Sequence, residues 1–148
     1  GRPRRLRLER GTGESFLTET EWVLFCPDPE NAQQVRDRAR SFLAEMALVR
    51  IRERLEVYAP RIGVSYGRVT VRNQRTRWGS CSAKGNLNFN WRLILAPEEC
   101  LEYVVIHELC HRREFNHSAR FWDLVQRQMR DYQVWKDYLK KNGAGLNF

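Results

Sequence analysis

The 148-residue sequence predicts an α+β chain from three patterns. Polar and apolar residues alternate over residues 86–95, which is the period of a half-buried strand. Apolar residues recur at helical spacing in a long stretch after Asp28, and again between Leu101 and Leu109. A chain of this length has the size of one ordinary domain, so we expect residues 1–148 to form a single domain.

A strand hairpin is expected within about residues 4–26. Residues 5–9 alternate between charged and apolar side chains, and residues 22–25 form a second apolar run. The glycines within residues 11–13 favour a turn between these two runs. The sequence therefore predicts that the two runs pair with each other.

A long helix is expected over about residues 29–58. Asp28 can cap its first turn, and Pro29 suits the first helical position. Pro60 and Gly63 are expected to end it. Its predicted core-facing residues are Val35, Ala39, Phe42, Leu43, Met46, Val49 and Leu55.

The remaining elements are a sheet within about residues 64–95 and three further helices. Pro97, followed by two acids, begins a helix over about residues 97–112, because acids are favourable near the positive end of a helix. Two more helices are expected within residues 118–141, and Ser118 can cap the first of them.

All three histidines of the chain, His107, His111 and His117, lie within eleven consecutive residues. His107 and His111 are four residues apart on an expected helix, so both rings can reach one cation. Asn116 tolerates a turn, which allows the chain to fold back and offer His117. Three histidines leave one position open, as a catalytic zinc requires, and nickel, cobalt or copper also suit imidazole ligands.

Glu108 lies directly after His107, about 100° further around the expected helix. This rotation keeps its carboxylate off the metal but near a metal-bound water. Residues 107–111 thus form the H-E-x-x-H pattern, in which the glutamate takes a proton from that water. We expect metal-assisted hydrolysis, with Glu108 passing the proton on to the leaving group.

Two other interpretations of the histidines stay open. In the first, they are ordinary helix and surface histidines. In the second, the metal is structural and Cys81 fills its fourth position. The four cysteines, which are Cys26, Cys81, Cys100 and Cys110, contain no C-x-x-C pair, so we expect reduced thiols.

The formal net charge of +8 predicts a surface that attracts polyanions. Nucleic acid or a nucleotide is therefore a possible partner, and a solvated basic surface is the simpler interpretation. Arg72, Arg75 and Arg77 lead into a glycine-containing loop shortly before the expected metal helix. These arginines are candidates for binding an anionic part of a substrate.

The chain contains no apolar run of about 18 residues and no basic-then-apolar start. We therefore expect no membrane span, no signal peptide and a cytoplasmic location. The natural substrate and the oligomeric state do not follow from the sequence.

The second half of the chain carries a series of short motifs. They are R-W-G-S-C at 77–81, G-N-L at 85–87, N-W-R-L at 90–93, A-P at 96–97, H-E-L-C-H at 107–111, and N-H-S at 116–118 followed by Phe121 and Trp122. Together they resemble the YgjP-like metallopeptidase family, which is related to the SprT-like proteins within the zincin metalloproteases. The resemblance covers roughly residues 68–143.

The resemblance implies a small zincin-like metalloprotease domain with an antiparallel or mixed sheet, a long N-terminal helix and an H-E-x-x-H helix. It implies one zinc ion held by His107, His111 and His117, with Glu108 as the catalytic acid/base.

In zincins, an edge strand beside the metal helix can pair with an extended peptide. The resemblance places this strand at residues 86–95, which makes Asn88 and Asn90 candidates for substrate binding. Tyr132, Tyr138 or an arginine is a candidate for stabilising the oxyanion.

These observations predict a zinc metallopeptidase that acts on a peptide or protein substrate. One alternative is a metal-dependent phosphoanhydride hydrolase in which Arg72, Arg75 or Arg77 holds the phosphate of a nucleotide. Another is a noncatalytic nucleic-acid-binding module with a basic surface and a structural metal.

Overall fold

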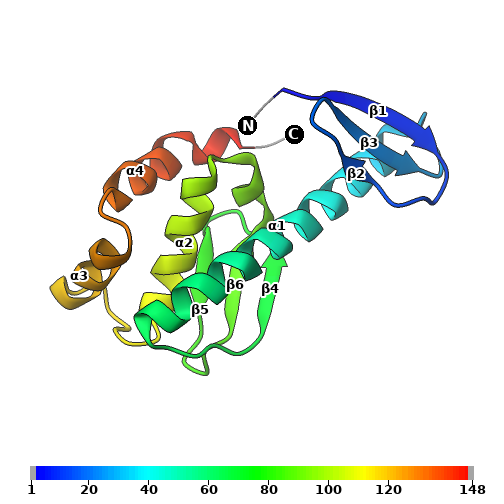
Figure 1. Ribbon diagram of the computed structural model, residues 1–148. Coiled ribbons are helices and arrows are strands. Elements are labelled where there is room, and N and C mark those ends of the chain that lie inside the picture. The colour runs from blue at the N-terminus through cyan, green and yellow to red at the C-terminus, as the bar shows by residue number, and fades with distance from the viewer. Residues whose placement is uncertain (1–2, 147–148) are drawn as a thin grey trace. The chain divides into compact units, whose positions relative to one another are not determined.

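A computed structural model describes residues 3–146 of the chain, which contain both helices and strands (Figure 1). The chain divides into two compact units, Gly1–Glu45 and Met46–Phe148, here called the N-terminal and C-terminal units. The architecture is α+β, with two small mixed sheets and four α-helices in the described part. Among these helices, none combines the length and apolar composition that a membrane crossing needs.

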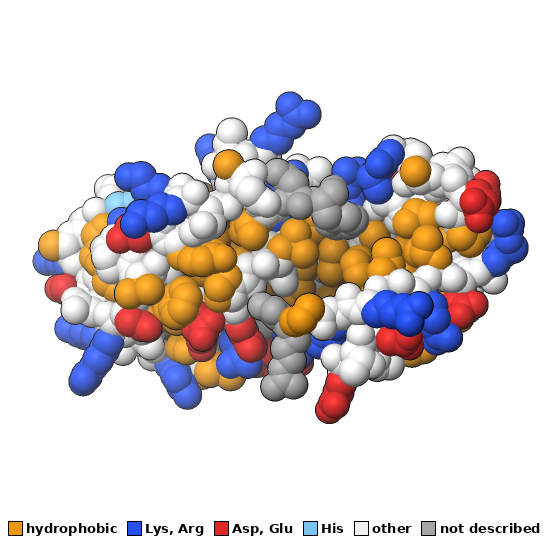
Figure 2. Space-filling view, turned by 90° about the horizontal axis from the view of Figure 1, so that it is seen from above, with side chains coloured by type: hydrophobic (Ala, Val, Ile, Leu, Met, Phe, Trp, Pro, Cys, Tyr) orange, Lys and Arg blue, Asp and Glu red, His pale blue; other side chains and the backbone are white. Residues whose placement is uncertain are grey.

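The N-terminal unit contains a three-stranded sheet of β1 (Arg5–Arg10), β2 (Phe16–Leu17) and β3 (Glu21–Cys26), in the order β1-β3-β2. The central strand β3 supplies the buried side chains Val23, Leu24 and Cys26. Apolar side chains also reach the surface of this unit (Figure 2), where Leu6, Leu8 and Phe16 are exposed.

The expected hairpin between residues 5–9 and 22–25 is wrong. The two strands are present, but β1 and β3 run parallel, with Arg5 opposite Glu21. Parallel neighbours require a crossing segment rather than a tight turn. Residues 11–20 supply that segment, and within it β2 pairs antiparallel with the other edge of β3.

Helix α1 (Ala32–Ile62) begins later than expected. The side chain of Asn31, rather than Asp28, accepts hydrogen bonds from the first free backbone N–H groups, those of Gln33 and Gln34. Asp28 instead accepts from the N–H of Glu30, which keeps residues 28–31 in a turn before the helix.

Pro60 does not end α1, contrary to the sequence prediction. It lies in the last turn of the helix, where its missing N–H costs one backbone hydrogen bond. The helix ends at Gly63, whose φ of +75° suits glycine and whose N–H bonds to the carbonyl of Ala59. Val49 is also misassigned, since it is 57% exposed and lies between the buried positions Ala47 and Ile51.

The sheet of the C-terminal unit consists of β4 (Val69–Arg72), β5 (Gly79–Cys81) and β6 (Leu87–Asn90). Its order is β4-β6-β5, with β4 parallel and β5 antiparallel to β6. The expected edge strand over residues 86–95 is therefore wrong in two respects. Strand β6 is central, and it ends at Asn90.

A short 3₁₀ helix, η1 (Trp91–Leu95), follows β6 directly. The side chain of Asn90 accepts from the N–H of Arg92 and so caps η1. The polar and apolar alternation of the sequence continues into η1 as far as Leu93, but the buried residues Trp91 and Leu93 belong to a helical turn.

Helix α2 (Glu98–Cys110) packs with the C-terminal part of α1 on one face of this sheet (Figure 1). Leu87 and Phe89 of β6 are fully buried in the same apolar core as Val105 of α2 and Ile51 of α1. Helices α3 (Ala119–Gln128) and α4 (Tyr132–Asn142) complete the unit and add Phe121 and Leu139 to this core.

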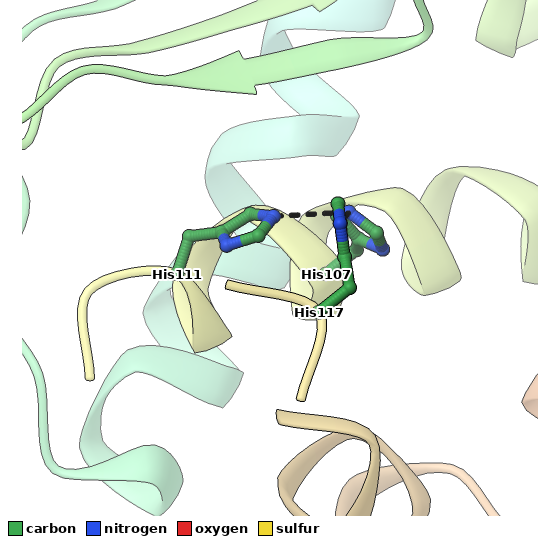
Figure 3. Close-up of side chains that lie close together, drawn as sticks. All are labelled: His107, His111 and His117. Atoms are coloured by element: carbon green, nitrogen blue, oxygen red, sulfur yellow. Dashed lines mark hydrogen bonds between the residues drawn. The ribbon is translucent and has the colours of Figure 1, made fainter. Parts of the chain in front are cut away.

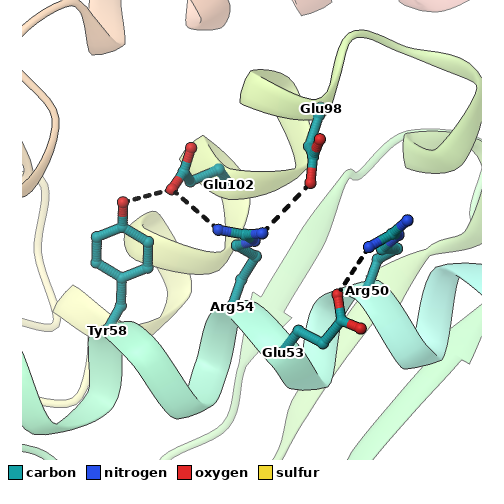
Figure 4. Close-up of polar contacts among 6 residues, drawn as sticks. All are labelled: Arg50, Glu53, Arg54, Tyr58, Glu98 and Glu102. Carbon is teal, nitrogen blue, oxygen red and sulfur yellow. Dashed lines mark hydrogen bonds and ion pairs between the residues drawn. The ribbon is translucent and has the colours of Figure 1, made fainter.

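A polar network joins α1 to α2 within the C-terminal unit (Figure 4). The guanidinium of Arg54 lies 3.4 Å from the carboxylate of Glu98 and 3.9 Å from that of Glu102. The Tyr58 hydroxyl donates a hydrogen bond to Glu102. Burial, together with this hydrogen bond, raises the pKa of Tyr58 to about 12, so the hydroxyl remains a donor at neutral pH. The network ties the first two turns of α2 to α1.

Candidate metal centre and adjoining pocket

The H-E-L-C-H residues lie at the C-terminal end of α2. His107 is in the last turn, and His111 is the residue after the last helical position. The chain then turns, with the N–H of Arg112 bonding to the carbonyl of Leu109. The Ser118 hydroxyl caps the next helix by accepting a hydrogen bond from the N–H of Phe121. The connecting loop therefore ends directly after His117. Two helix ends and one turn thus position three imidazoles.

The three imidazole rings converge (Figure 3). The Nε2 atom of His107 lies 3.2 Å from Nε2 of His111 and 3.1 Å from Nε2 of His117. A tetrahedral zinc with bonds of 2.0 to 2.1 Å holds its nitrogen ligands about 3.3 Å apart, so these spacings fit such an ion. Within residues 3–146 this is the only group of three or more side chains of metal-binding type that comes so close together.

In His107 and His111, a neighbouring oxygen contacts Nδ1, so the Nε2 atom of each ring is available for a metal. Nδ1 of His111 lies 3.1 Å from the carbonyl of Glu114, and Nδ1 of His107 lies 3.3 Å from the Tyr103 hydroxyl. With Nδ1 protonated, each ring donates to its oxygen and keeps an Nε2 lone pair for a cation. This arrangement is typical of histidines that bind metals.

Burial, followed by the charges of the neighbouring His111 and His117 rings, lowers the pKa of His107 to about 3. Burial also lowers the pKa of His111. Both rings are therefore neutral at neutral pH, which is the protonation state that a metal ligand needs.

Aromatic side chains of α3 support the imidazoles. The fully buried ring of Phe121 stacks on His111 with a centroid separation of 4.5 Å. Trp122 stacks on His117 at 5.7 Å and on Tyr132 at 5.4 Å. These contacts restrict the rotation of the rings, so the convergence of the histidines is built into the core.

The side chain of Glu108 lies against β5 of the sheet. It is only 5% exposed, and a Cβ atom built on Gly79 of β5 would lie 3.0 Å from its Cγ and Oε1 atoms. Burial raises the pKa of Glu108 to about 8, although the nearby charge of Arg77 opposes this shift. The carboxyl group is thus held out of bulk water, beside Gly79 of β5.

A cavity of about 280 Å³ adjoins His107 and Glu108. Three elements form its walls: α2, the start of β5 with the loop before it, and α4. Besides His107 and Glu108, its lining residues are Arg77, Trp78, Gly79, Tyr103, Val104, Lys136, Leu139 and Lys140. We call this cavity the site pocket.

The model of the YgjP-like, metallopeptidase domain matches residues 1–142 of the chain. The chain belongs to the YgjP-like family. This membership confirms the resemblance that the sequence motifs indicated. No curated protein sequence gives a match.

Two solved structures share the fold of the YgjP-like chain. The metallopeptidase zymogen abylysin of Pyrococcus abyssi is 23% identical, with a TM-score of 0.55 over 62% of this chain and 93% of its own. The metallopeptidase zymogen jannalysin of Methanocaldococcus jannaschii is 16% identical, with a TM-score of 0.54 over 62% of this chain and 94% of its own. At these identities the comparison shows the α+β zincin-like fold.

The closed structural site with Cys81 as fourth ligand is not supported in the YgjP-like chain. Cys81 lies on β5 and is not part of the histidine cluster. Burial and the charge of Glu108 both raise the pKa of its thiol, which disfavours the thiolate that binds metal. The interpretation of the histidines as unrelated helix and surface residues is likewise not supported, because their rings converge.

Of the substrate-binding candidates, Arg77 alone lines the site pocket. Arg72 and Arg75 are exposed and do not line it. Tyr132 stacks on Trp122 and Tyr103 and does not line the site pocket. Asn88 accepts a hydrogen bond from the Thr70 hydroxyl of β4.

Strand alternation places Asn88 and Asn90 on the face of the sheet opposite α2, since Leu87 and Phe89 point into the core. Asn90 is 3% exposed, and its amide donates to the carbonyls of Gln74 at 2.7 Å and Arg77 at 3.1 Å. Asn90 therefore supports the loop before β5 rather than a substrate.

Sequence reasoning missed Tyr103, Lys136 and Lys140. Tyr103 precedes His107 by four residues, and this helical spacing was a usable signal. Lys136 and Lys140 share a face of α4 with Leu139 by the same rule, but no local pattern shows that this face turns toward α2.

Replacing Gly79 with alanine is expected to lower kcat about tenfold while zinc affinity stays unchanged. The added Cβ would meet Glu108 and Val104 at 3.0 Å, so these side chains must move by a few tenths of an ångström. The sequence predicts that Glu108 is the reacting base, and misplacing such a group by 1 Å lowers the rate about 100-fold, so a smaller shift should cost correspondingly less. Steady-state kinetics and zinc titration measure the two quantities.

Ser80→Ala is the matched control, since Ser80 is the next residue of β5 and points to the opposite face of the sheet. A Gly79→Ala variant with wild-type kcat would show that Glu108 tolerates this displacement.

Replacing Asn90 with alanine is expected to destabilise the chain by about 1–3 kcal/mol, because the buried amide loses its hydrogen bonds to the carbonyls of Gln74 and Arg77. Equilibrium denaturation measures this change. Asn88→Ala is the control and should cost less, since it removes only the bond to Thr70. Equal losses in both variants would contradict the structural role of Asn90.

Proposed function

We propose that this YgjP-like chain is a zinc-dependent metallopeptidase, with His107, His111 and His117 as ligands and Glu108 as general acid/base. The observation that carries the proposal is the set of Nε2 atoms 3.1–3.2 Å apart at the end of the helix that bears a buried carboxylate. The family and the fold are those of metallopeptidases. A three-histidine site leaves a coordination position for a reactant.

The chemistry divides between the ion and the protein. When bound, zinc supplies the Lewis acidity that makes water a nucleophile near neutral pH and polarises a carbonyl. The ionised form of Glu108, which predominates above the pKa of about 8 in the metal-free chain, takes the proton from the attacking water and returns it to the leaving amine, so that the C–N bond of the substrate breaks. Tyr103 holds the ring of His107 through its contact with Nδ1.

The edge of β5 is the proposed path for an extended substrate. Strand β5 pairs with β6 on one side, and no described strand covers its other side. A peptide can add to such an edge through backbone hydrogen bonds. Because Gly79 of β5 adjoins Glu108, a peptide in this position passes beside the proposed base. Strand β5 thus takes the role that the sequence prediction gave to residues 86–95.

The nucleotide-hydrolase alternative is not favoured. Of the three arginines proposed to hold phosphate, only Arg77 lines the site pocket. Nothing in the described geometry specifically supports binding of nucleic acid, and the cytoplasmic location stays a prediction.

The test is hydrolysis by the full chain loaded with zinc. Unfolded casein and a mixture of peptides are the substrates, and mass spectrometry identifies new termini. We expect cleavage that stops when a chelator removes the zinc and returns when zinc is restored. Hydrolysis of nucleoside triphosphates in the absence of any peptide cleavage would refute the peptidase proposal.

A further inference from the structure

We propose that the site pocket selects peptides in which a carboxylate lies next to an apolar anchor residue. This inference rests on the proposed peptidase function and names the substrate class of the same site. It follows from two properties of the pocket, an apolar floor and a rim with three cations.

The floor consists of Trp78, Val104 and Leu139. Val104 and Leu139 are each 4% exposed, so their positions are set by the core. Gly143 lies against the indole of Trp78, where a Cβ atom would come within 2.5 Å of the ring. The indole is therefore held in place from behind, and the floor offers a fixed apolar surface to a substrate side chain.

The rim carries Arg77, Lys136 and Lys140. Arg77 and Lys140 are exposed, and the ammonium of Lys136 lies 4.1 Å from the ring centroid of Trp122. Among the described residues, no carboxylate lies within ion-pair distance of these three cations. The single acid that lines the pocket is Glu108, which is buried. The rim thus presents positive charges that form no ion pair with a described carboxylate, although the charge of Arg77 acts on the buried Glu108.

The sequence around β5 adds to the excess of positive over negative charge near the pocket. Residues 57–97, which include all three strands of this sheet, contain no aspartate or glutamate. A peptide lying along the edge of β5 therefore meets no opposing acid on the sheet. Acidic substrates are attracted to such a surface, and a lysine or arginine in the same place is repelled.

The apolar floor fits an apolar side chain of the peptide. The cationic rim fits a carboxylate next to that side chain. Two sources supply that group: an acidic side chain on the adjacent residue, or the α-carboxylate of a C-terminal apolar residue. The chemistry at the rim is the same in both cases, so the experiment must separate them.

The test measures binding to the zinc-loaded Glu108→Gln variant, which is expected to bind peptide without cleaving it. The probes are fluorescently labelled peptides of one sequence in which the residue after a central leucine is Glu, Gln or Lys. We expect the Glu peptide to bind about tenfold more tightly than the Lys peptide, as a few partly exposed ion pairs allow. Fluorescence anisotropy gives the affinities, and the preference should shrink as salt screens the charges.

Lys140→Glu in the same background is expected to remove the preference. Lys141→Glu is the matched control, because Lys141 is the next residue of α4, carries the same charge and does not line the pocket. The Lys141→Glu variant should keep the preference for the Glu peptide over the Lys peptide. Equal affinity for the Glu and Lys peptides, or equal loss in both variants, would overturn the inference.

A second set of peptides ends in leucine, with either a free carboxylate or an amide at the C-terminus. If the peptide with the free carboxylate binds more tightly than its amide, the rim binds an α-carboxylate. If only the internal Glu raises affinity, the rim binds an acidic side chain. Cleavage by the wild-type chain without any acidic preference would refute this inference and leave the peptidase function standing. Selective binding without cleavage by the zinc-loaded wild type would refute the peptidase function instead.

Discussion

Glu108→Gln is expected to abolish peptide hydrolysis while zinc binding persists. The amide has the shape of the carboxyl group but cannot accept a proton from water, so the loss should be about 100- to 10,000-fold in kcat. Zinc binding should persist because Glu108 is not part of the histidine cluster and faces β5. The rate of peptide cleavage and the zinc content of the purified variant measure the two effects.

Glu102→Gln is the matched control for this substitution. Glu102 lies on the same helix, but its carboxylate contacts Tyr58 and Arg54 rather than the site pocket. This variant should cleave at the wild-type rate, although its stability can change. Full turnover by Glu108→Gln would assign the base to another residue.

Loss of the metal is the second large effect, and His117→Ala is the cleanest way to produce it. His117 is exposed, whereas His107 and His111 are half-buried, so its removal disturbs the core least. Removing a residue that only hydrogen-bonds to a metal ligand lowers metal affinity by about 10- to 100-fold. Removing the ligand itself should therefore lower zinc affinity by at least about 100-fold. Activity at limiting zinc should fall in parallel.

Thermal unfolding gives an independent measurement of this loss. Zinc at 100 times its dissociation constant stabilises a folded protein by about 2.7 kcal/mol, so zinc should raise the Tm of the wild type. The same zinc concentration should leave the Tm of His117→Ala nearly unchanged. Equal shifts in both proteins would mean that the stabilising ion binds outside the histidine cluster.

The local geometry of the site could be read from the sequence. His107 and His111 share a helix face because the backbone repeats every 3.6 residues, and Glu108 is turned away from them for the same reason. Ser118 begins α3 because its hydroxyl accepts a hydrogen bond from a free backbone N–H. Each of these predictions depends on residues within one helical turn of each other.

Predictions that required distant partners were less successful. The alternation over residues 86–95 did not show that a cap at Asn90 converts its second half into η1. It also did not show that β6 is central, because strand order depends on β4 and β5. Likewise, the parallel pairing of β1 with β3 depends on the path of the residues between them.

The sequence by itself determined the three imidazoles, the adjacent carboxyl group and the helix that spaces them, because helical hydrogen bonds link residues only four positions apart. Only the tertiary structure decided which groups surround them. It brought Gly79 of β5 to Glu108, and it placed Lys136 and Lys140 of α4 on the rim of the site pocket. Those neighbours come from segments far apart in the chain, and burial of a shared apolar core brings them together.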